Sequence, residues 1–152
     1  ELAQQHMTEE NTTVKGLRDR LERGLVASVR NAFVNGDKLY RLPNTASIAF
    51  EYVEGEAILL LLNQQGIAAS SGSACTSGSL EPSHVLRAMA IPYTAAHGTI
   101  RFSLSRYNTV EEVDRVVAAV PPVIAKLRKL SPYWSGDAPL AHPDEAFQPE
   151  YA

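Results

Sequence analysis

Hydrophobic and polar residues follow periods in the first half of the chain that predict a helix, a strand and a second helix. Residues 1–31 gather hydrophobic side chains near one stripe, with Glu, Arg and Lys opposite, which predicts one long amphipathic helix. Residues 46–53 are rich in β-branched and aromatic side chains and predict a strand. Residues 54–65 predict a helix with a buried middle, and Gly66 stands where a left-handed helix terminus is favoured.

Shorter elements and turns follow or connect these segments. Residues 35–37 (NGD) predict a turn, and residues 67–70 a short strand. Residues 82–89 predict a short helix with Pro82 at its first position. Residues 99–105 alternate apolar and polar side chains, as a half-buried strand does.

The last helix has a clear predicted start and an interrupted middle. Thr109 and Glu112 have the spacing of a capping box, so a helix is predicted to begin after Thr109. We expect Pro121-Pro122 to break or kink this helix, because proline lacks the backbone N–H and crowds the preceding turn. Residues 131–152 contain four prolines and no helical period, which predicts an irregular tail.

The order of these elements predicts an α/β fold with a small sheet, antiparallel or mixed, covered by helices and preceded by a long N-terminal helix. The 152 residues suffice for one domain with a hydrophobic core. We place that domain at residues 1–130, with residues 1–31 as a linking helix and residues 131–152 as the tail.

Composition excludes several functional classes. The formal net charge is −3, and because a nucleic-acid-binding domain needs a basic face, we expect no nucleic-acid partner. The longest apolar run, residues 57–62, is too short to span a bilayer, and residues 1–6 are polar, unlike a secretory signal. The single cysteine excludes a disulfide framework and predicts a cytoplasmic setting. The chain starts at Glu1, inside a predicted helix, so we expect a piece of a longer protein.

Cys75 is the first candidate for chemistry. It lies in residues 71–79, where five of nine residues are Ser or Thr and two are Gly. A lone cysteine is often a buried, inert residue, but these polar neighbours do not fit a core position. The composition therefore favours an exposed, reactive thiol, part of which is the nucleophilic thiolate at neutral pH.

Two histidines and two arginines complete the candidate set. His84 and His97 could each serve as the base of a Cys-His hydrolase, although no Asp or Asn stands at a spacing that would orient them. Arg101 faces away from the apolar side of its predicted strand and could hold a carboxylate through a bidentate pair, or form a surface ion pair. Arg106 is a second cation of the same kind with less support.

Three segments together resemble a known family. Residues 70–78 (SSGSACTSG) resemble the active-site cysteine loop of the group I cysteine desulfurases, the NifS/IscS type. Residues 81–89 (EPSHVLRAM) and residues 100–106 (IRFSLSR) resemble the segments that follow it in the same family. The resemblance is closest to the NifS branch, which serves nitrogenase cluster assembly, and is weakest in the tail.

The resemblance implies the small domain of a fold-type I transferase that depends on pyridoxal 5'-phosphate. The family's Schiff-base lysine lies in a Ser-x-His-Lys segment of a large domain, and no such segment occurs here. The only lysines are Lys15, Lys38, Lys126 and Lys129, and none has that context. We therefore expect this chain to hold no cofactor-binding lysine.

The resemblance also implies roles for two residues. The thiolate of Cys75 would take sulfur from L-cysteine, leaving L-alanine and a persulfide, and Arg101 would hold the substrate carboxylate. The persulfide would pass to an iron–sulfur scaffold protein of the NifU/IscU type, and Cys75 could transiently share a [2Fe-2S] cluster with it. The implied enzyme is a homodimer. The alternatives left open are a sulfur-carrying interaction module without turnover and the Cys-His hydrolase.

Overall fold

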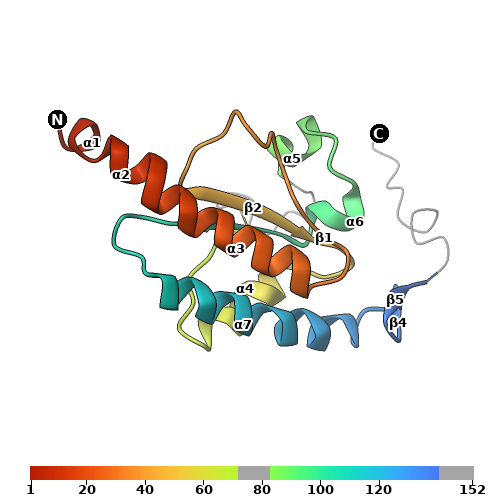
Figure 1. The fold of residues 1–152 in the computed structure, drawn as a ribbon. Coiled ribbons are helices and arrows are strands. Elements are labelled where there is room, and N and C mark those ends of the chain that lie inside the picture. The colour runs from red at the N-terminus through yellow and green to blue at the C-terminus, as the bar shows by residue number, and fades with distance from the viewer. Residues whose placement is uncertain (72–82, 141–152) are drawn as a thin grey trace.

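The computed structural model describes residues 1–71 and 83–140 (Figure 1). Helices and short strands alternate along these residues. In chain order they are α1 (Leu2–Gln5), α2 (Met7–Glu9), the π-helix η1 (Glu10–Val14), α3 (Lys15–Ser28), β1 (Ala32–Val34), β2 (Thr45–Phe50), α4 (Gly55–Asn63), α5 (His84–Ala88), α6 (Tyr93–Ala96), β3 (Thr99–Ser103), α7 (Val110–Arg128), β4 (Trp134–Ser135) and β5 (Ala138–Pro139).

The central sheet is antiparallel, with strand order β1-β2-β3. Its middle strand, β2, agrees with the predicted strand but ends at Phe50, because the chain turns there and Tyr52 has a φ of +64°. β3 matches the predicted alternation, with Ile100 and Phe102 buried and Arg101 exposed. The sheet therefore has one apolar face and one polar face.

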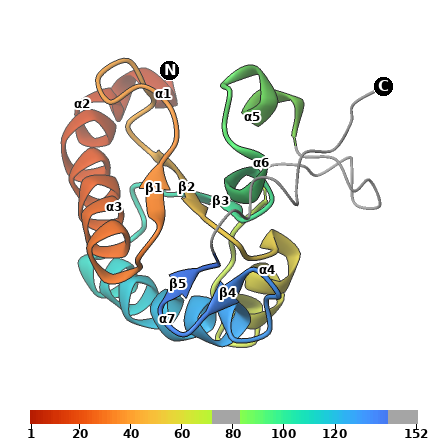
Figure 2. The ribbon, with the colours of Figure 1, turned by 90° about the vertical axis from the view of Figure 1, so that its right-hand side faces the viewer.

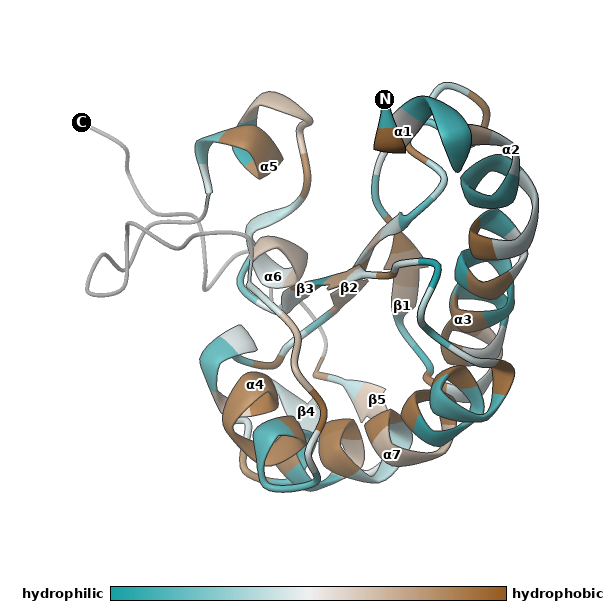
Figure 3. Ribbon diagram, turned by 90° about the vertical axis from the view of Figure 1, so that its left-hand side faces the viewer, coloured by the Kyte–Doolittle hydropathy of each residue, from teal (hydrophilic) through white to brown (hydrophobic). Residues whose placement is uncertain are grey.

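Helices α3, α4 and α7 cover the apolar face (Figures 1 and 2). The hydrophobic residues of α3 and α7 gather on the sides that face the core (Figure 3), whereas α4 is apolar on most sides and leaves Leu60 exposed. Burying these side chains drives the folding of the layer. The core includes Leu17, Leu21, Leu25, Ile48, Phe50, Ile58, Leu62, Ile100, Val120 and Ile124.

The polar face of the sheet is only partly covered. α6, which the sequence pattern did not reveal, lies against one end of it, where the Thr99 hydroxyl donates to the Ala95 carbonyl at 3.0 Å. Thr99 is accordingly buried, whereas Arg101 and Ser103, further along the same strand, are exposed. The open end of this face is thus the part of the sheet that a ligand can reach.

The N-terminal helical segment is long, as predicted, but it is interrupted. A turn at His6 separates α1 from α2, and α3 ends at Ser28 rather than near residue 31. Within and beside η1, Asn11 and Thr12 donate side-chain hydrogen bonds of 2.8 and 2.7 Å to the carbonyls four residues earlier. Such bonds compete with the backbone pattern and explain why regular α-helix is not kept there.

The long helix α7 confirms one prediction and corrects another. The Thr109 hydroxyl accepts from the Glu112 N–H, and the Glu112 carboxylate accepts from the Thr109 N–H, which completes the predicted capping box. Of the break or kink predicted at Pro121-Pro122, the break is wrong, because α7 continues through both residues to Arg128. Buried Val120 and Ile124 pack into the core on either side of the prolines and hold this part of the helix in place.

The short elements agree with the sequence only in part. The predicted strand at residues 67–70 is reduced to a single bridge between Ser70 and Arg101. The predicted helix at residues 82–89 is α5, which begins at His84 after the N-cap Ser83. Pro82, predicted at its first position, lies outside the described residues. The predicted turn after Asn35 forms, with Gly36 at a φ of +92°.

The segment from Ser131, predicted to be irregular, instead forms a small hairpin from β4 and β5. Residues 141–152, the remainder of the predicted tail, lie outside the described residues. Gly66 has a φ of +71° and ends α4 in the left-handed conformation that we expected. Within residues 1–71 and 83–140, no helix has both the length and the apolar character needed to cross a membrane.

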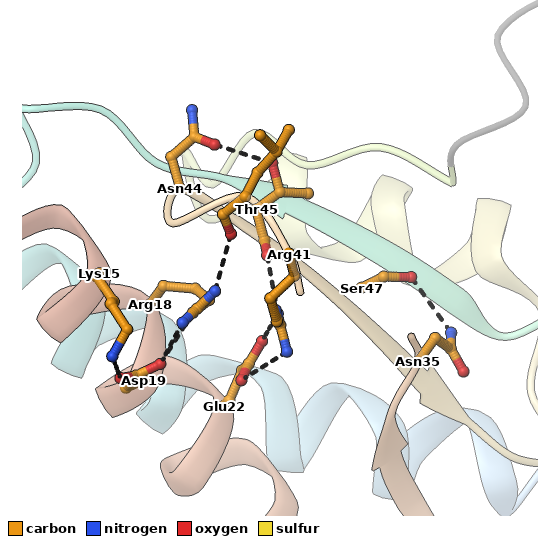
Figure 4. A network of polar contacts seen from close by, with 10 residues as sticks. Lys15, Arg18, Asp19, Glu22, Asn35, Arg41, Asn44, Thr45 and Ser47 are labelled. Atoms are coloured by element: carbon orange, nitrogen blue, oxygen red, sulfur yellow. Dashed lines mark hydrogen bonds and ion pairs between the residues drawn. The ribbon is translucent and has the colours of Figure 1, made fainter. Parts of the chain in front are cut away.

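Electrostatic contacts hold the loop between β1 and β2 against α3. Arg41 forms a largely buried ion pair with Glu22 (Figure 4). Arg18 donates to the Leu42 carbonyl at 2.8 Å. The Asp37 carboxylate accepts the backbone N–H groups of Tyr40 and Leu39, which lowers its pKa below the ordinary value. The loop is therefore anchored at both the α3 side and its own first turn.

Arg128 fastens the end of α7 to two turns. Its guanidinium donates to the carbonyls of Arg30 at 2.6 Å, Asn31 at 3.3 Å and Glu51 at 3.1 Å. It also lies over the Trp134 ring, 4.1 Å from the ring centroid. Burial lowers the pKa of Arg128 to about 10, so it remains charged at neutral pH.

Gly98 allows a close backbone approach beside the sheet. A Cβ at this position would overlap the carbonyl oxygen of Phe50 and would lie 2.8 Å from that of Val53. Phe50 in turn donates its N–H to the Gly98 carbonyl at 3.1 Å. Only glycine can therefore occupy this position without moving the end of β2 away from the start of β3.

We expect Gly98→Ala to destabilise the protein by about 3 kcal/mol, because the added methyl group meets backbone atoms that cannot turn aside. Gly16→Ala is the matched control: a Cβ at Gly16 meets nothing within 4 Å, so helix propensity predicts a gain of about 0.5–1 kcal/mol. Urea unfolding measures both changes. Equal stability of the two variants would contradict the close approach.

We expect Arg128→Lys to lower the unfolding free energy by about 3 kcal/mol, because the compact ammonium group lacks the planar fork with which Arg128 reaches three separate carbonyl groups, and because its stacking on Trp134 is lost. Arg115→Lys, on the same helix, is the control, since Arg115 is exposed and donates to a single carbonyl, that of Gln65. We expect the control to change stability by less than about 0.5 kcal/mol. Thermal unfolding followed by circular dichroism compares the two.

Candidate functional site

Arg101 stands on the open part of the polar sheet face. It lies at the middle of β3, and its partner across the ladder on β2 is Ser47. Within residues 1–71 and 83–140, no residue forms a hydrogen bond or an ion pair with its guanidinium group. Of the two roles considered for Arg101, a surface ion pair therefore has no support among these residues, and a carboxylate receptor stays open. A fixed strand that carries an exposed guanidinium is a suitable receptor for a carboxylate.

The backbone of Arg101 joins β3 to the segment that leads toward Cys75. Its N–H donates to the Ser70 carbonyl at 2.6 Å, and its carbonyl accepts the Ser70 N–H at 3.1 Å. Cys75 itself lies outside the described residues. Because five extended residues reach at most about 17 Å, Cys75 stays within that distance of Ser70. The segment that leads toward Cys75 is thus joined to the strand that carries Arg101.

The two candidate histidines lie in different surroundings. His84 is exposed at the start of α5. His97 follows α6, packs against the Tyr93 ring at a centroid distance of 4.3 Å, and lies 3.9 Å from the Glu54 carboxylate. Its buried Nε2 has no hydrogen-bond partner in the described part of the chain. Neither histidine is held by an orienting hydrogen bond of the kind that a Cys-His pair requires, so the geometry does not favour the hydrolase.

His97 also borders a cavity of about 260 Å³ on the α7 side of the molecule, lined by Tyr52, Tyr93, Leu127 and Tyr133 among others. The cavity is mainly apolar and does not contain Arg101. It is therefore separate from the open sheet face that carries the guanidinium.

The lysines do not form a cofactor site in this chain. Lys15, Lys38, Lys126 and Lys129 are all exposed, and Lys15 pairs with Asp19 at 3.3 Å. A Schiff-base lysine needs an enclosed amine with a lowered pKa, and none of these side chains is enclosed. The residues present thus do not fit pyridoxal phosphate. Among the residues that the structure describes, no three His, Cys, Asp or Glu side chains cluster to hold a metal ion.

Sequence reasoning missed one buried polar residue, Asn35, on the sheet face that carries Arg101. Asn35 is buried at the end of β1, and its amide donates to the hydroxyl oxygens of Ser47 and Thr99 at 3.2 Å each. The residues 35–37 were assigned only to a turn, because the sequence cannot show that a turn residue reaches across two strands. The hydroxyl-bearing positions on the two partner strands are the only signal that could have indicated the contact.

Comparison with curated proteins finds relatives that are similar over nearly the whole chain. The chain is 72% identical over 145 residues to a cysteine desulfurase of Azotobacter chroococcum, covering 95% of this chain and 37% of that protein. It is 70% identical over 151 residues to the cysteine desulfurase NifS of Azotobacter vinelandii, covering 99% of this chain and 38% of that protein. These matches confirm the resemblance to the NifS type, and the chain spans little more than a third of the relatives' length.

Solved structures agree on the fold. A NifS-like protein superposes with a TM-score of 0.70 at 31% identity, over 83% of this chain and 31% of that protein. A NifS-like protein from Rickettsia africae gives a TM-score of 0.70 at 28% identity, over 82% and 31% of the two chains. The model of the aminotransferase class-V family matches residues 2–116. With its α/β sheet, its long N-terminal helical segment and this match over most of its length, the chain belongs to the aminotransferase class-V family.

Proposed function

We propose that this chain is the small domain of a cysteine desulfurase, which removes sulfur from L-cysteine and leaves L-alanine. The observation that carries the proposal is the backbone pairing of Arg101 with Ser70. It joins the segment that leads toward Cys75 to a guanidinium that has no partner among the described residues. The names of the relatives, cysteine desulfurase and cysteine desulfurase NifS, support the same reaction. A large domain outside this chain would hold pyridoxal phosphate, because the lysines here are exposed.

In this proposal Arg101 binds the carboxylate of L-cysteine and so fixes the position of the substrate thiol. The strand supports this role, because the ladder fixes the backbone of Arg101 and the planar guanidinium offers a carboxylate two parallel donors. Binding through the carboxylate is independent of the side chain of the substrate. Arg101 therefore orients the substrate, and Cys75 supplies the chemistry.

Cys75 would act as the sulfur acceptor. Its thiolate attacks the substrate sulfur, a sulfur–sulfur bond forms, and the carbon–sulfur bond breaks with its electron pair going to carbon, which takes up a proton. The products are L-alanine and a Cys75 persulfide. Pyridoxal phosphate, when bound to the complete protein, supplies the electron sink for the negative charge on the substrate.

The proposal includes the fate of the sulfur. The persulfide passes to an iron–sulfur scaffold protein of the NifU/IscU type in nitrogenase maturation, in a cytoplasmic homodimeric enzyme, and Cys75 can transiently share a [2Fe-2S] cluster with that scaffold. Ser/Gly-rich composition around Cys75 supports transfer, because such a segment gains little by burying itself. A second candidate is a sulfur carrier without turnover. For this chain alone it is favoured because the four lysines are exposed, and an exposed lysine does not suit the Schiff base that turnover needs.

Cys75→Ala in the full-length protein is expected to reduce alanine release from L-cysteine by at least about 100-fold, because no other thiol on this chain can accept sulfur. The absorbance of the bound cofactor should remain unchanged. Ser73→Ala, two positions away, is the control and should retain activity. Undiminished turnover in Cys75→Ala would rule out the acceptor role.

Arg101→Lys is expected to raise the KM for L-cysteine about 10-fold or more, because an ammonium group cannot form the bidentate pair. Arg106→Lys is the control: the Arg106 guanidinium is exposed and donates to the Tyr107 hydroxyl at 2.6 Å. Steady-state kinetics of the full-length variants measure both. A larger increase in KM for Arg106→Lys than for Arg101→Lys would show that Arg101 is not the arginine that binds the carboxylate.

A further inference from the structure

Ser47 and Arg101 are direct neighbours across two strands. The β2–β3 register places them opposite each other. The N–H and the C=O of Arg101 both bond to Ser70, on the side of β3 that faces away from β2. Ser47 and Arg101 therefore share no backbone hydrogen bond, and pairs of this kind bring their side chains closest, with about 4.5–5.5 Å between the Cβ atoms.

Both side chains belong to the polar face of the sheet. The next residues along the two strands, Ile48 and Ile100, are fully buried on the opposite face. Arg101 is exposed, and Ser47 is half-buried. A partly accessible hydroxyl group thus lies beside the stem of an exposed guanidinium.

The Ser47 hydroxyl has a hydrogen to spare. Its oxygen accepts from the Asn35 amide at 3.2 Å (Figure 4). A serine hydroxyl also carries one hydrogen to donate, and residues 1–71 and 83–140 provide no acceptor for it. Because Asn35 donates to the oxygen, the hydrogen must point elsewhere.

Two other hydroxyl groups on this face are already committed as donors. The Thr99 hydroxyl donates to the Ala95 carbonyl at 3.0 Å, and the Thr45 hydroxyl donates to the Asn44 side-chain oxygen at 3.2 Å. Ser103 is exposed on the same face, but it lies two residues along β3 from Arg101, a separation of about 7 Å. Ser47 is therefore both uncommitted as a donor and directly paired with Arg101.

Two neighbouring donors without an acceptor between them suit a ligand group that only accepts hydrogen bonds. A carboxylate is such a group, since its two oxygens can accept about four hydrogen bonds. A bidentate pair with a guanidinium uses two of these sites. Because no described residue holds the Arg101 side chain, it is free to lean over Ser47 and bring a bound carboxylate to the hydroxyl.

We propose that Ser47 is a second binding residue for the substrate carboxylate, to which its hydroxyl donates a hydrogen bond beside the bidentate pair with Arg101. This role rests on the proposed function and makes the carboxylate receptor a pair of residues across β2 and β3. Arg101 supplies the charge. Ser47 adds a donor from a second strand, which selects one orientation of the carboxylate on the guanidinium.

The first test measures the KM for L-cysteine in the full-length protein with its cofactor. We expect Ser47→Ala to raise KM about 10-fold, the effect of losing one hydrogen bond to a charged group. Ser47→Thr keeps the hydroxyl and should remain within about twofold of the parent. Ser103→Ala, which removes an exposed hydroxyl from the same face, is the matched control and should leave KM unchanged.

The second test uses 3-mercaptopropionate, which has the thiol and the carboxylate of L-cysteine but no amino group. As a competitive inhibitor it reports on carboxylate binding without turnover. We expect its inhibition constant to rise about 10-fold in Ser47→Ala and to stay unchanged in Ser103→Ala. An inhibition constant in Ser47→Ala equal to that of the parent would overturn the proposal.

A third measurement separates binding from stability, since Ser47→Ala also removes one acceptor of the Asn35 amide. A lowered melting temperature with an unchanged KM would leave Ser47 a structural residue. Equal increases in KM for Ser47→Ala and Ser103→Ala would likewise overturn its specific role. In an Arg101→Lys background we expect a smaller effect of Ser47→Ala on KM, because two residues that bind one carboxylate are coupled.

Failure of the proposed function and failure of the Ser47 role give different results. If the parent protein releases no alanine from L-cysteine, or if Arg101→Lys leaves KM unchanged, the proposed function fails and the role of Ser47 falls with it. If the parent is active and Arg101→Lys raises KM while Ser47→Ala does not, only the role of Ser47 is overturned.

Discussion

The contact between Gly98 and the end of β2 sets the geometry on which the site depends. Phe50 and Gly98 approach so closely that no side-chain carbon fits between them, and the hydrogen bond from Phe50 to Gly98 fixes where β3 begins. A strand has a period of two, so the position of its first residue decides which side chains face the core. Here that choice buries Ile100 and Phe102 and leaves Arg101 on the open face.

The two faces of the sheet have different roles. Three helices bury its apolar face, and this burial provides the stability that lets the other face carry polar groups. α6 covers one end of the polar face, and the other end remains open around Arg101. Because the helices hold the sheet from behind, a ligand can approach Arg101 without displacing any part of the core.

The sequence was informative wherever a signal is local. The Thr109–Glu112 capping box and the alternation around Arg101 depend on neighbours a few residues away, and both were confirmed. Signals that depend on distant residues were misread or missed. The prolines of α7 are tolerated because the core holds the helix on both sides, and Asn35 reaches Thr99 over 64 positions of sequence. The role of Cys75 stays a prediction, since it lies outside the described residues.

Arg101 links two parts of the proposed reaction through different groups of one residue. Its backbone holds Ser70 in a two-way pair, and its side chain is free of described partners and can bind a carboxylate. A substrate bound to this guanidinium is therefore held on the same strand that anchors the Cys75 segment. The strand thus gives the proposed carboxylate receptor and the start of the Cys75 segment a common support.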